Sequence, residues 1–152
     1  MAFAADRQRS RRSGRALALQ SVFEAEFGQR TASTALERHL AEVQPDRLAA
    51  DLAGSIVDAV VDDRNTIDGL IGRHAPRYPV TSLARMDRAL LRCAIGEVLH
   101  SPTPTRVAIA EWVELARIYS GEPVRRLLNG VLGRIAAEEI GPEPDDATAG
   151  RS

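Results

Sequence analysis

The chain contains a single cysteine, Cys93, among its 152 residues. One cysteine cannot close an internal disulfide, and this favours a reducing compartment. Nowhere does the sequence hold about 18 uninterrupted apolar residues, and residues 1–15 contain no apolar run of signal-peptide length. These absences predict a cytoplasmic protein that neither spans nor contacts a membrane.

Aromatic residues are also scarce, at 4% of the chain, whereas hydrophobic residues make up 44%. Packing must therefore rely on Ala, Leu, Val and Ile, which suits helices better than a sheet sandwich. A chain of this length forms one domain that buries roughly 70% of the surface exposed when it is unfolded. The composition predicts one all-α domain.

Recognised catalytic and metal-binding patterns are missing as well. His39, His74 and His100 lie in separate segments, and no His-x-x-x-His pair occurs. One cysteine cannot complete a zinc site with them at a recognised spacing. No glycine-rich phosphate loop follows a predicted strand. We therefore expect no catalytic residue, metal ligand or cofactor, and no enzyme activity.

Charge is unevenly distributed along a chain whose formal net charge is only -1. Lysine is absent, and arginines crowd the start, where Asp6 is the only acidic residue within residues 1–15. They are Arg7, Arg9, Arg11, Arg12 and Arg15. Acidic residues gather at the other end, namely Glu138, Glu139, Glu143, Asp145 and Asp146. We expect a flexible basic arm over residues 1–15 and a disordered acidic tail over residues 142–152.

Apolar periodicity predicts helices through the first half of the intervening segment. A stripe that includes Phe23 and Phe27 predicts a helix over residues 15–27. Thr34 and Glu37 have capping-box spacing and predict a short helix to about residue 43. Asp46 is an expected N-cap for an apolar face over residues 48–71, in one helix or two.

Two prolines within residues 74–79 predict a break, so that the domain over residues 16–141 divides into halves at about 16–75 and 80–141. In the second half, Ser82 is an expected N-cap, and the helix it starts should end before residue 101. Thr103 and Pro104 predict the start of another helix that stops near Gly121. A last helix runs from Pro123 to about residue 141.

Three segments carry a family resemblance that spans roughly residues 11–135. The strongest is the final helix pair, with Val-Ala-Ile from Val107, Glu-x-x-x-Leu-Ala-Arg ending at Arg117, and Asn-Gly-Val-Leu from Asn129. The second runs from Met86 to Leu99, and the third is the arginine-rich start leading into residues 18–23. In this order and spacing, the segments resemble the NusB family of transcription antitermination factors.

The resemblance implies about six or seven helices packed as two small bundles. It also implies a non-catalytic function in which boxA-type single-stranded RNA from ribosomal RNA leaders is bound together with the ribosomal protein NusE. The pair would join the transcription elongation complex. Whether the free protein is a monomer or a homodimer stays open.

Candidate RNA-binding residues are Arg9, Arg11, Arg12 and Arg15 in the basic arm. Each guanidinium can neutralise a phosphate and release counterions. Four such contacts on single-stranded RNA predict a roughly 50-fold loss of affinity between 50 and 200 mM salt. Asn129 is a further candidate, although it could instead satisfy a buried backbone group, and Gly130 beside it suggests a close helix crossing.

Phe23 and Asp87 are candidate partner-binding residues by the same resemblance. A phenylalanine at this spacing could equally belong to the core, and Asp87 could form an ordinary ion pair with Arg88 or Arg92. Glu97 is expected to be a structural carboxylate.

Three positions depart from the family pattern, namely Leu127, Pro123 and Trp112, and they weaken the transfer of RNA-site details. Two other functions remain open. A NusB-like fold also forms the N-terminal domain of ribosomal RNA cytosine methyltransferases, so the chain could be a detached RNA-binding module of that kind. It could also be a helical adaptor that binds only protein. Partner binding that survives the loss of the arginines would favour the adaptor.

Overall fold

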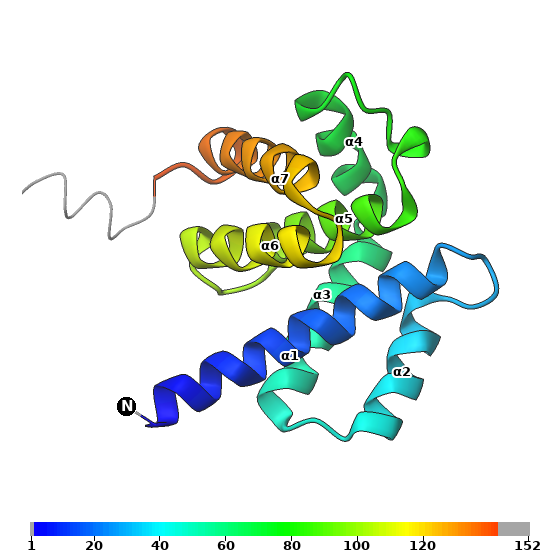
Figure 1. Cartoon of the computed structure of the whole chain (residues 1–152), viewed down its shortest axis with the longest axis vertical. Coiled ribbons are helices and arrows are strands. Elements are labelled where there is room, and N and C mark those ends of the chain that lie inside the picture. The colour runs from blue at the N-terminus through cyan, green and yellow to red at the C-terminus, as the bar shows by residue number, and fades with distance from the viewer. Residues whose placement is uncertain (1, 143–152) are drawn as a thin grey trace, which may run out of the picture.

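A computed structural model of the chain describes residues 2–142, which contain helices, turns and loops but no strand. The prediction of an all-α fold is confirmed (Figure 1). The α-helices are α1 (Ala2–Ala25), α2 (Ala32–Val43), α3 (Arg47–Asp62), α4 (Arg64–His74), α5 (Arg85–His100), α6 (Thr105–Tyr119) and α7 (Glu122–Ile135). A short 3-10 turn, η1 (Val80–Ser82), precedes α5, and a π-helical turn, η2 (Ala136–Ile140), follows α7. Within residues 2–142, none of these helices has the length and apolar character needed to cross a membrane.

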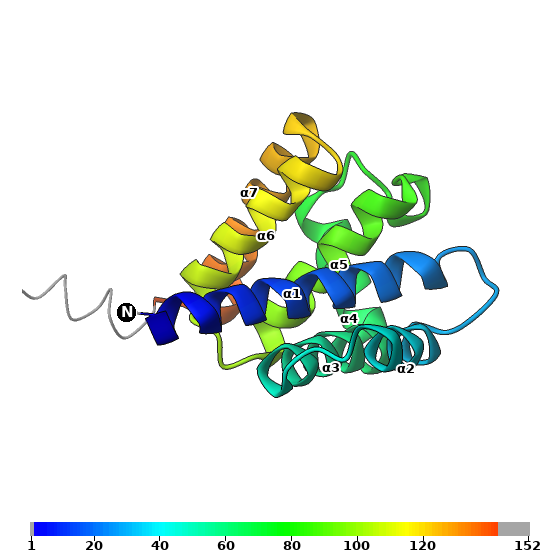
Figure 2. The ribbon, with the colours of Figure 1, turned by 60° about the horizontal axis from the view of Figure 1, so that its bottom comes forward.

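The first bundle consists of α1, α2 and α3, and all three helices pack against one another. Figure 2 shows the long helix α1 lying across α3 and α2. Gly14 permits the close crossing of α1 and α3, because a Cβ atom at this position would lie 2.7 Å from the backbone oxygen of Ala49. A side chain there would collide with backbone that cannot move aside cheaply.

The second bundle is built around α5, whose residues 89–98 are all buried. This helix packs against α6 and α4, and also against α3 and α1, so it joins the two bundles. Helices α6 and α7 form an antiparallel pair on one side of α5 (Figure 1). Helix α4 contacts both α5 and α7. It therefore packs with the second bundle, although the sequence placed it in the N-terminal half.

Local capping chemistry explains several helix boundaries. Asp46 is the N-cap of α3, as predicted, and its carboxylate accepts a 2.9 Å hydrogen bond from the amide of Ala49. The predicted capping box at Thr34 is wrong, because α2 begins three residues earlier. Its N-cap is Thr31, whose hydroxyl accepts a hydrogen bond from the amide of Thr34. Thr31 and Thr34 are three residues apart, and either threonine could serve as an N-cap, so the sequence alone did not show which of them begins the helix.

Two other predicted boundaries shift, and one ambiguity is settled. Ser82 lies in η1 and does not cap α5, which begins at Arg85. Helix α6 starts at Thr105 with Pro104 as its N-cap, one residue later than predicted from Thr103. Residues 47–74 form two helices, and Asp63 is both the C-cap of α3 and the N-cap of α4.

The largest difference from the sequence prediction concerns the basic arm, because residues 2–15 belong to α1. Alanine, arginine and glutamine are good helix formers. Contacts with the folded domain also hold this segment, since Ser10 hydrogen-bonds to Asp46 and Arg12 pairs with Glu111. These contacts outweigh the mutual repulsion of the arginines. The predicted acidic tail over residues 142–152 lies outside the described residues, except for Pro142 itself.

Candidate nucleic-acid and partner surfaces

The N-terminal half of α1 carries exposed arginines. Arg7, Arg9 and Arg12 are exposed, and Arg11 is half-buried. Arg9 pairs with Asp6 one turn away. Arg11 lines a shallow hollow beside the loop that joins α5 to α6. Three of the four predicted RNA-binding arginines are therefore within reach of a ligand.

Arg15, the fourth, is buried and has a structural role. Its side chain forms a two-pronged ion pair with Glu97 on α5, at 2.8 Å from Nε to Oε1 and 2.7 Å from Nη2 to Oε2. Trp112 on α6 donates its indole N–H to the same carboxylate at 2.7 Å. Arg15 is only 1% exposed, so it cannot contact RNA in this fold, and the prediction for it is wrong. Glu97 is a satisfied structural carboxylate, as predicted.

Arg12 faces outward at the junction of α1 and α6. Its side chain is 57% exposed and pairs with Glu111 at 3.1 Å. The pKa of Glu114 is lowered, first by a hydrogen bond from Arg117 and further by the nearby charges of Arg117, Arg12 and Arg125. Arg12 and Arg117 both pair with carboxylates of α6, and Arg125 lies on α7, which packs against α6. The sequence did not place Arg117 or Arg125 near the arginines of α1, because these residues come from distant helices.

Asn129 extends this surface along α7. It is exposed and lies one turn after Arg125, so both residues occupy the same helix face. The alternative role for Asn129, satisfying a buried backbone group, does not fit its exposure. Gly130 is not at a close helix crossing, because the nearest atoms to an added Cβ belong to the flexible side chain of Arg134.

Phe23 lies at the other end of α1, in an apolar hollow of about 250 Å³. It is half-buried and packs against the core, and its ring meets that of Phe27 edge to face at 5.2 Å. The guanidinium of Arg85 lies 4.7 Å from the centre of the Phe27 ring. Tyr119 lines the same hollow. Sequence periodicity placed Phe27 in the core, but α1 ends at Ala25 and Phe27 is exposed.

Asp87 lies beside this hollow, which brings the two predicted partner-binding residues together. Met86 lines the hollow, and the Asp87 carboxylate accepts a 2.5 Å hydrogen bond from Ser120, the residue after Tyr119. The alternative ion pairs of Asp87 are not observed. Phe23, Phe27, Tyr119 and Asp87 together form what we call the aromatic hollow.

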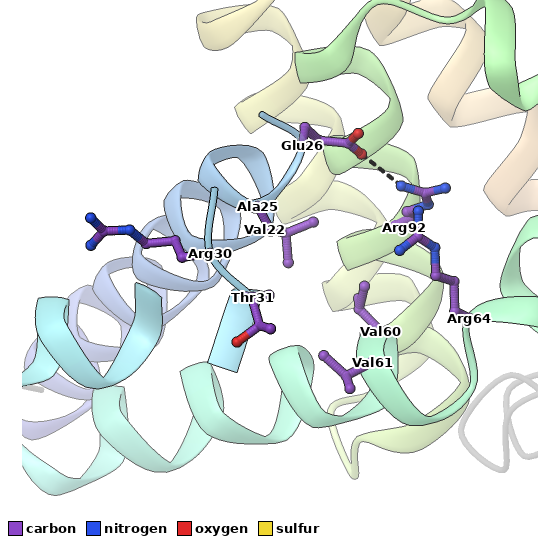
Figure 3. A pocket seen from close by; sticks show the side chains of 10 residues that line it. Val22, Ala25, Glu26, Arg30, Thr31, Val60, Val61, Arg64 and Arg92 are labelled. Atoms are coloured by element: carbon purple, nitrogen blue, oxygen red, sulfur yellow. Dashed lines mark hydrogen bonds and ion pairs between the residues drawn. The ribbon is translucent and has the colours of Figure 1, made fainter. Parts of the chain in front are cut away.

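A second, largely buried ion-pair network joins the two bundles. Glu26 accepts hydrogen bonds from Arg88 at 2.8 Å and from Arg92 at 2.6 Å, and Arg92 also donates to Asp68 at 2.9 Å. The hydrogen bond that Arg88 donates to Glu26 raises the pKa of Arg88 above its ordinary value. Figure 3 shows Glu26 and Arg92 facing one another at the rim of a groove, with Val60 lining its wall. No local pattern in the sequence predicts this network.

The three departures from the family pattern have different structural consequences. Trp112 is fully buried and bonded to Glu97, so it does not form an exposed patch. Leu127 is partly buried and packs against the core, and Pro123 lies in the first turn of α7.

Burial raises the pKa of the Cys93 thiol, which makes it a poor nucleophile.

Comparisons with known proteins agree with this architecture. The model of the NusB family matches residues 12–137. The transcription antitermination protein NusB of Heliobacterium modesticaldum is 40% identical over 130 residues, which cover 85% of this chain and 63% of that protein. The NusB protein of Dehalococcoides mccartyi strain 195 is 34% identical over 128 residues, which cover 84% of this chain and 90% of the relative.

Solved structures give the same result. T. maritima NusB superposes with a TM-score of 0.78 at 32% identity, covering 84% of this chain and 91% of that one. A structure of the antitermination factors NusB and NusE in complex with dsRNA contains a chain that matches with a TM-score of 0.73 at 25% identity. The match covers 84% of this chain and 96% of that one. The family model, the relatives and the shared fold together show that the chain belongs to the NusB family.

Proposed function

We propose that the chain is a non-catalytic, cytoplasmic transcription antitermination factor that binds boxA-type RNA together with NusE and thereby modifies elongation by RNA polymerase, especially on ribosomal RNA operons. Relatives named as transcription antitermination proteins, and a similar fold solved with NusE and RNA, support this proposal. The observation that carries it is the presence of two separate candidate surfaces, one at each end of the long helix α1.

The RNA surface consists of Arg9, Arg11 and Arg12, with Asn129 as an outlying contact. When RNA binds, Arg9 exchanges its exposed partner Asp6 for a phosphate at little energetic cost. Arg12, whose side chain is 57% exposed, reaches a phosphate while it stays beside Glu111, which is only 14% exposed. Because α1 is already helical, these side chains are presented without ordering an arm first. Binding therefore avoids most of the backbone entropy loss that a flexible arm would incur.

The partner surface is the aromatic hollow. It combines an exposed aromatic ring with a carboxylate at its edge, which suits a protein partner that brings an apolar side chain and a positive charge. Phe23 lies 12 residues after Arg11, which is about 18 Å along a helix. RNA and NusE can therefore bind at the same time without sharing contacts on α1.

The burial of Arg15 changes the expected salt dependence. Three phosphate contacts, each contributing about -0.7 to the slope of log affinity against log salt, give an approximately 20-fold loss between 50 and 200 mM salt. Phosphate contacts carry no sequence information, so discrimination of the boxA bases must come from contacts to base edges or from stacking.

The test compares a boxA oligomer with a scrambled one, each with and without NusE, by fluorescence anisotropy. We expect preference for boxA that strengthens when NusE is present. Replacing Arg9, Arg11 and Arg12 with glutamine should weaken binding of both oligomers. The matched control replaces the exposed Arg73 and Arg77, which lie at and just after the end of α4, and should leave binding unchanged.

Equal affinity for the two oligomers under every condition would contradict sequence-specific recognition and favour a general RNA-binding module. NusE binding without any RNA binding would favour the protein-only adaptor. Both outcomes would overturn the proposed function.

A further inference from the structure

The end of α4 and the π-helical turn η2 bring a histidine and two carboxylates together. His74 is the last residue of α4, and Glu138 and Glu139 are adjacent in η2. One ligand atom from each of the three residues can be chosen so that all lie within 4.8 Å of one another. His74 lies more than 60 positions before the two glutamates in the sequence, which is why local ligand spacing predicted no metal site.

His74 supplies an independent sign that a ligand belongs here. The residue is 6% exposed, and its buried Nε2 atom has no hydrogen-bond partner. Its neighbour is Oε2 of Glu138 at 3.3 Å, a contact that does not meet hydrogen-bond geometry. An unsatisfied polar atom in a buried position is costly. A cation held between the nitrogen and the carboxylate would satisfy both.

The geometry points to a divalent transition-metal site formed by His74, Glu138 and Glu139, with Zn²⁺ as the preferred ion. Zinc bonds of about 2.0–2.2 Å to nitrogen and oxygen place neighbouring ligands of a tetrahedral site about 3.3–3.6 Å apart. The His74–Glu138 separation of 3.3 Å already lies in this range. An imidazole ligand favours zinc over magnesium and calcium, which prefer oxygen donors.

Access and the surrounding charges fit this assignment. The side chain of Glu138 is 54% exposed, so an ion and its fourth ligand, a water molecule, can enter from solvent. Arg73 pairs with Oε1 of Glu139 at 3.2 Å, which leaves Oε2 for the metal. Arg73 is the cation that pairs with a ligand carboxylate and competes with the metal for it. A bound ion would tie the end of α4 to the turn after α7.

The backbone supports the same position. Gly141 donates a 2.9 Å hydrogen bond to the oxygen of Ala136 and closes the π turn that holds both glutamates. Single π turns occur frequently at functional sites. On the facing side, Arg134 donates to the backbone oxygen of His74 at 2.7 Å and fixes the end of α4. Both ligand-bearing segments are thus positioned before an ion binds.

The experiment titrates Zn²⁺ into the chelator-treated full chain by isothermal titration calorimetry. We expect one ion per chain, no comparable binding of Mg²⁺, and a rise in Tm on the order of 5–10 °C at a zinc concentration 100 times the Kd. Co²⁺ substituted at the site should give the absorption spectrum of a tetrahedral ion.

Variants then locate the ion. Glu138→Gln alters an exposed side chain and should leave the fold intact, yet it should weaken zinc binding by at least about tenfold, as losing even an outer-shell partner does. His74→Gln should do the same. Arg73→Gln should tighten binding, because it removes the competing cation.

The matched control is His100→Gln. His100 contacts a single carboxylate, that of Asp63 at 2.7 Å, in a separate acidic hollow. Its loss should leave zinc affinity unchanged. Failure of the wild-type chain to bind zinc, binding that survives both Glu138→Gln and His74→Gln, or loss of binding in His100→Gln would each overturn the assignment. None of these results depends on RNA or NusE.

Discussion

Replacing Arg15 with alanine separates the core role of this residue from RNA binding. The substitution removes both prongs of the ion pair with Glu97, a residue 82 positions away that is buried on α5. Glu97 would then keep only the 2.7 Å hydrogen bond from Trp112. A buried carboxylate would be left without its counter-charge, and the aliphatic stem of Arg15 would no longer pack between the helices.

The expected loss is large compared with the stability of a domain of this size. Two hydrogen bonds to a charged group contribute about 1.5–3 kcal/mol each. Breaking a buried ion pair by removing one partner costs about 3–5 kcal/mol, which agrees with this sum. Native domains are stable by only about 5–15 kcal/mol. Arg15→Ala should therefore lower the free energy of unfolding by about 3–5 kcal/mol.

Urea unfolding followed by circular dichroism measures this change. Arg12→Gln is the matched control, because Arg12 lies on the same helix as Arg15 but is 57% exposed, and its pair with Glu111 of α6 is open to solvent on the arginine side. This change should lower stability by only about 1 kcal/mol. In RNA binding we expect the opposite pattern, with an effect of Arg12→Gln and none of Arg15→Ala. Arg12→Gln should reduce the salt slope by about 0.7, whereas folded Arg15→Ala should keep the wild-type slope.

A stability within about 1 kcal/mol of wild type, combined with a shallower salt slope for Arg15→Ala, would refute the burial of Arg15. A double variant gives a further check. Arg15→Met with Glu97→Gln removes both charges and keeps an acceptor for Trp112, so it should recover most of the lost stability.

Three further predictions concern the scaffold. Gly14→Ala should destabilise the domain by about 1–3 kcal/mol, because its Cβ would lie 2.7 Å from the oxygen of Ala49. Gly54→Ala, whose Cβ would have no atom within 4 Å, should stabilise α3 by up to about 1 kcal/mol. Urea unfolding measures both changes. Hydrogen bonds, first from a serine hydroxyl and then from a backbone amide, lower the pKa of Asp46, so this carboxylate stabilises the fold above its unfolded pKa and ceases to do so as pH falls through the folded value. Asp46→Asn should therefore make the free energy of unfolding fall less steeply as the pH drops below about 4, and an unchanged pH profile would contradict this. Glu26→Gln should cost about 3–5 kcal/mol in urea unfolding, because two largely buried guanidinium groups would lose their shared counter-charge; a loss below 1 kcal/mol would contradict the network.

Helices and their local boundaries could be predicted where the signal lies within a few residues. Asp46 was identified as an N-cap because its carboxylate reaches an amide three positions ahead. Phe27 was misplaced because periodicity does not show where α1 ends, and Gly28, with a φ of 79°, belongs to the turn that follows. The position of a helix end decided whether this ring was core or surface.

The candidate site was predictable by residue type and region but not by side-chain environment. Arg12 and Arg15 are identical in type and three positions apart on one helix. One is exposed and the other buried, because Arg15 meets Glu97 from α5 while Arg12 meets solvent and Glu111. Glu97 lies 82 positions from Arg15 in the sequence, and Glu111 lies 99 positions from Arg12. Contacts at such separations depend on how the bundles pack, which no local pattern reports.

The most direct test of two independent surfaces on α1 measures boxA RNA and NusE binding in paired variants, each confirmed to be folded. Replacing Arg9, Arg11 and Arg12 with glutamine should weaken RNA binding but leave affinity for NusE alone within about twofold, since α1 separates the surfaces by about 18 Å. Phe23→Ala should weaken NusE binding and leave the salt slope for RNA alone unchanged. If either change abolished both interactions in a folded protein, the two surfaces would not be independent. That result would contradict the proposal that RNA and NusE bind at the same time through separate surfaces.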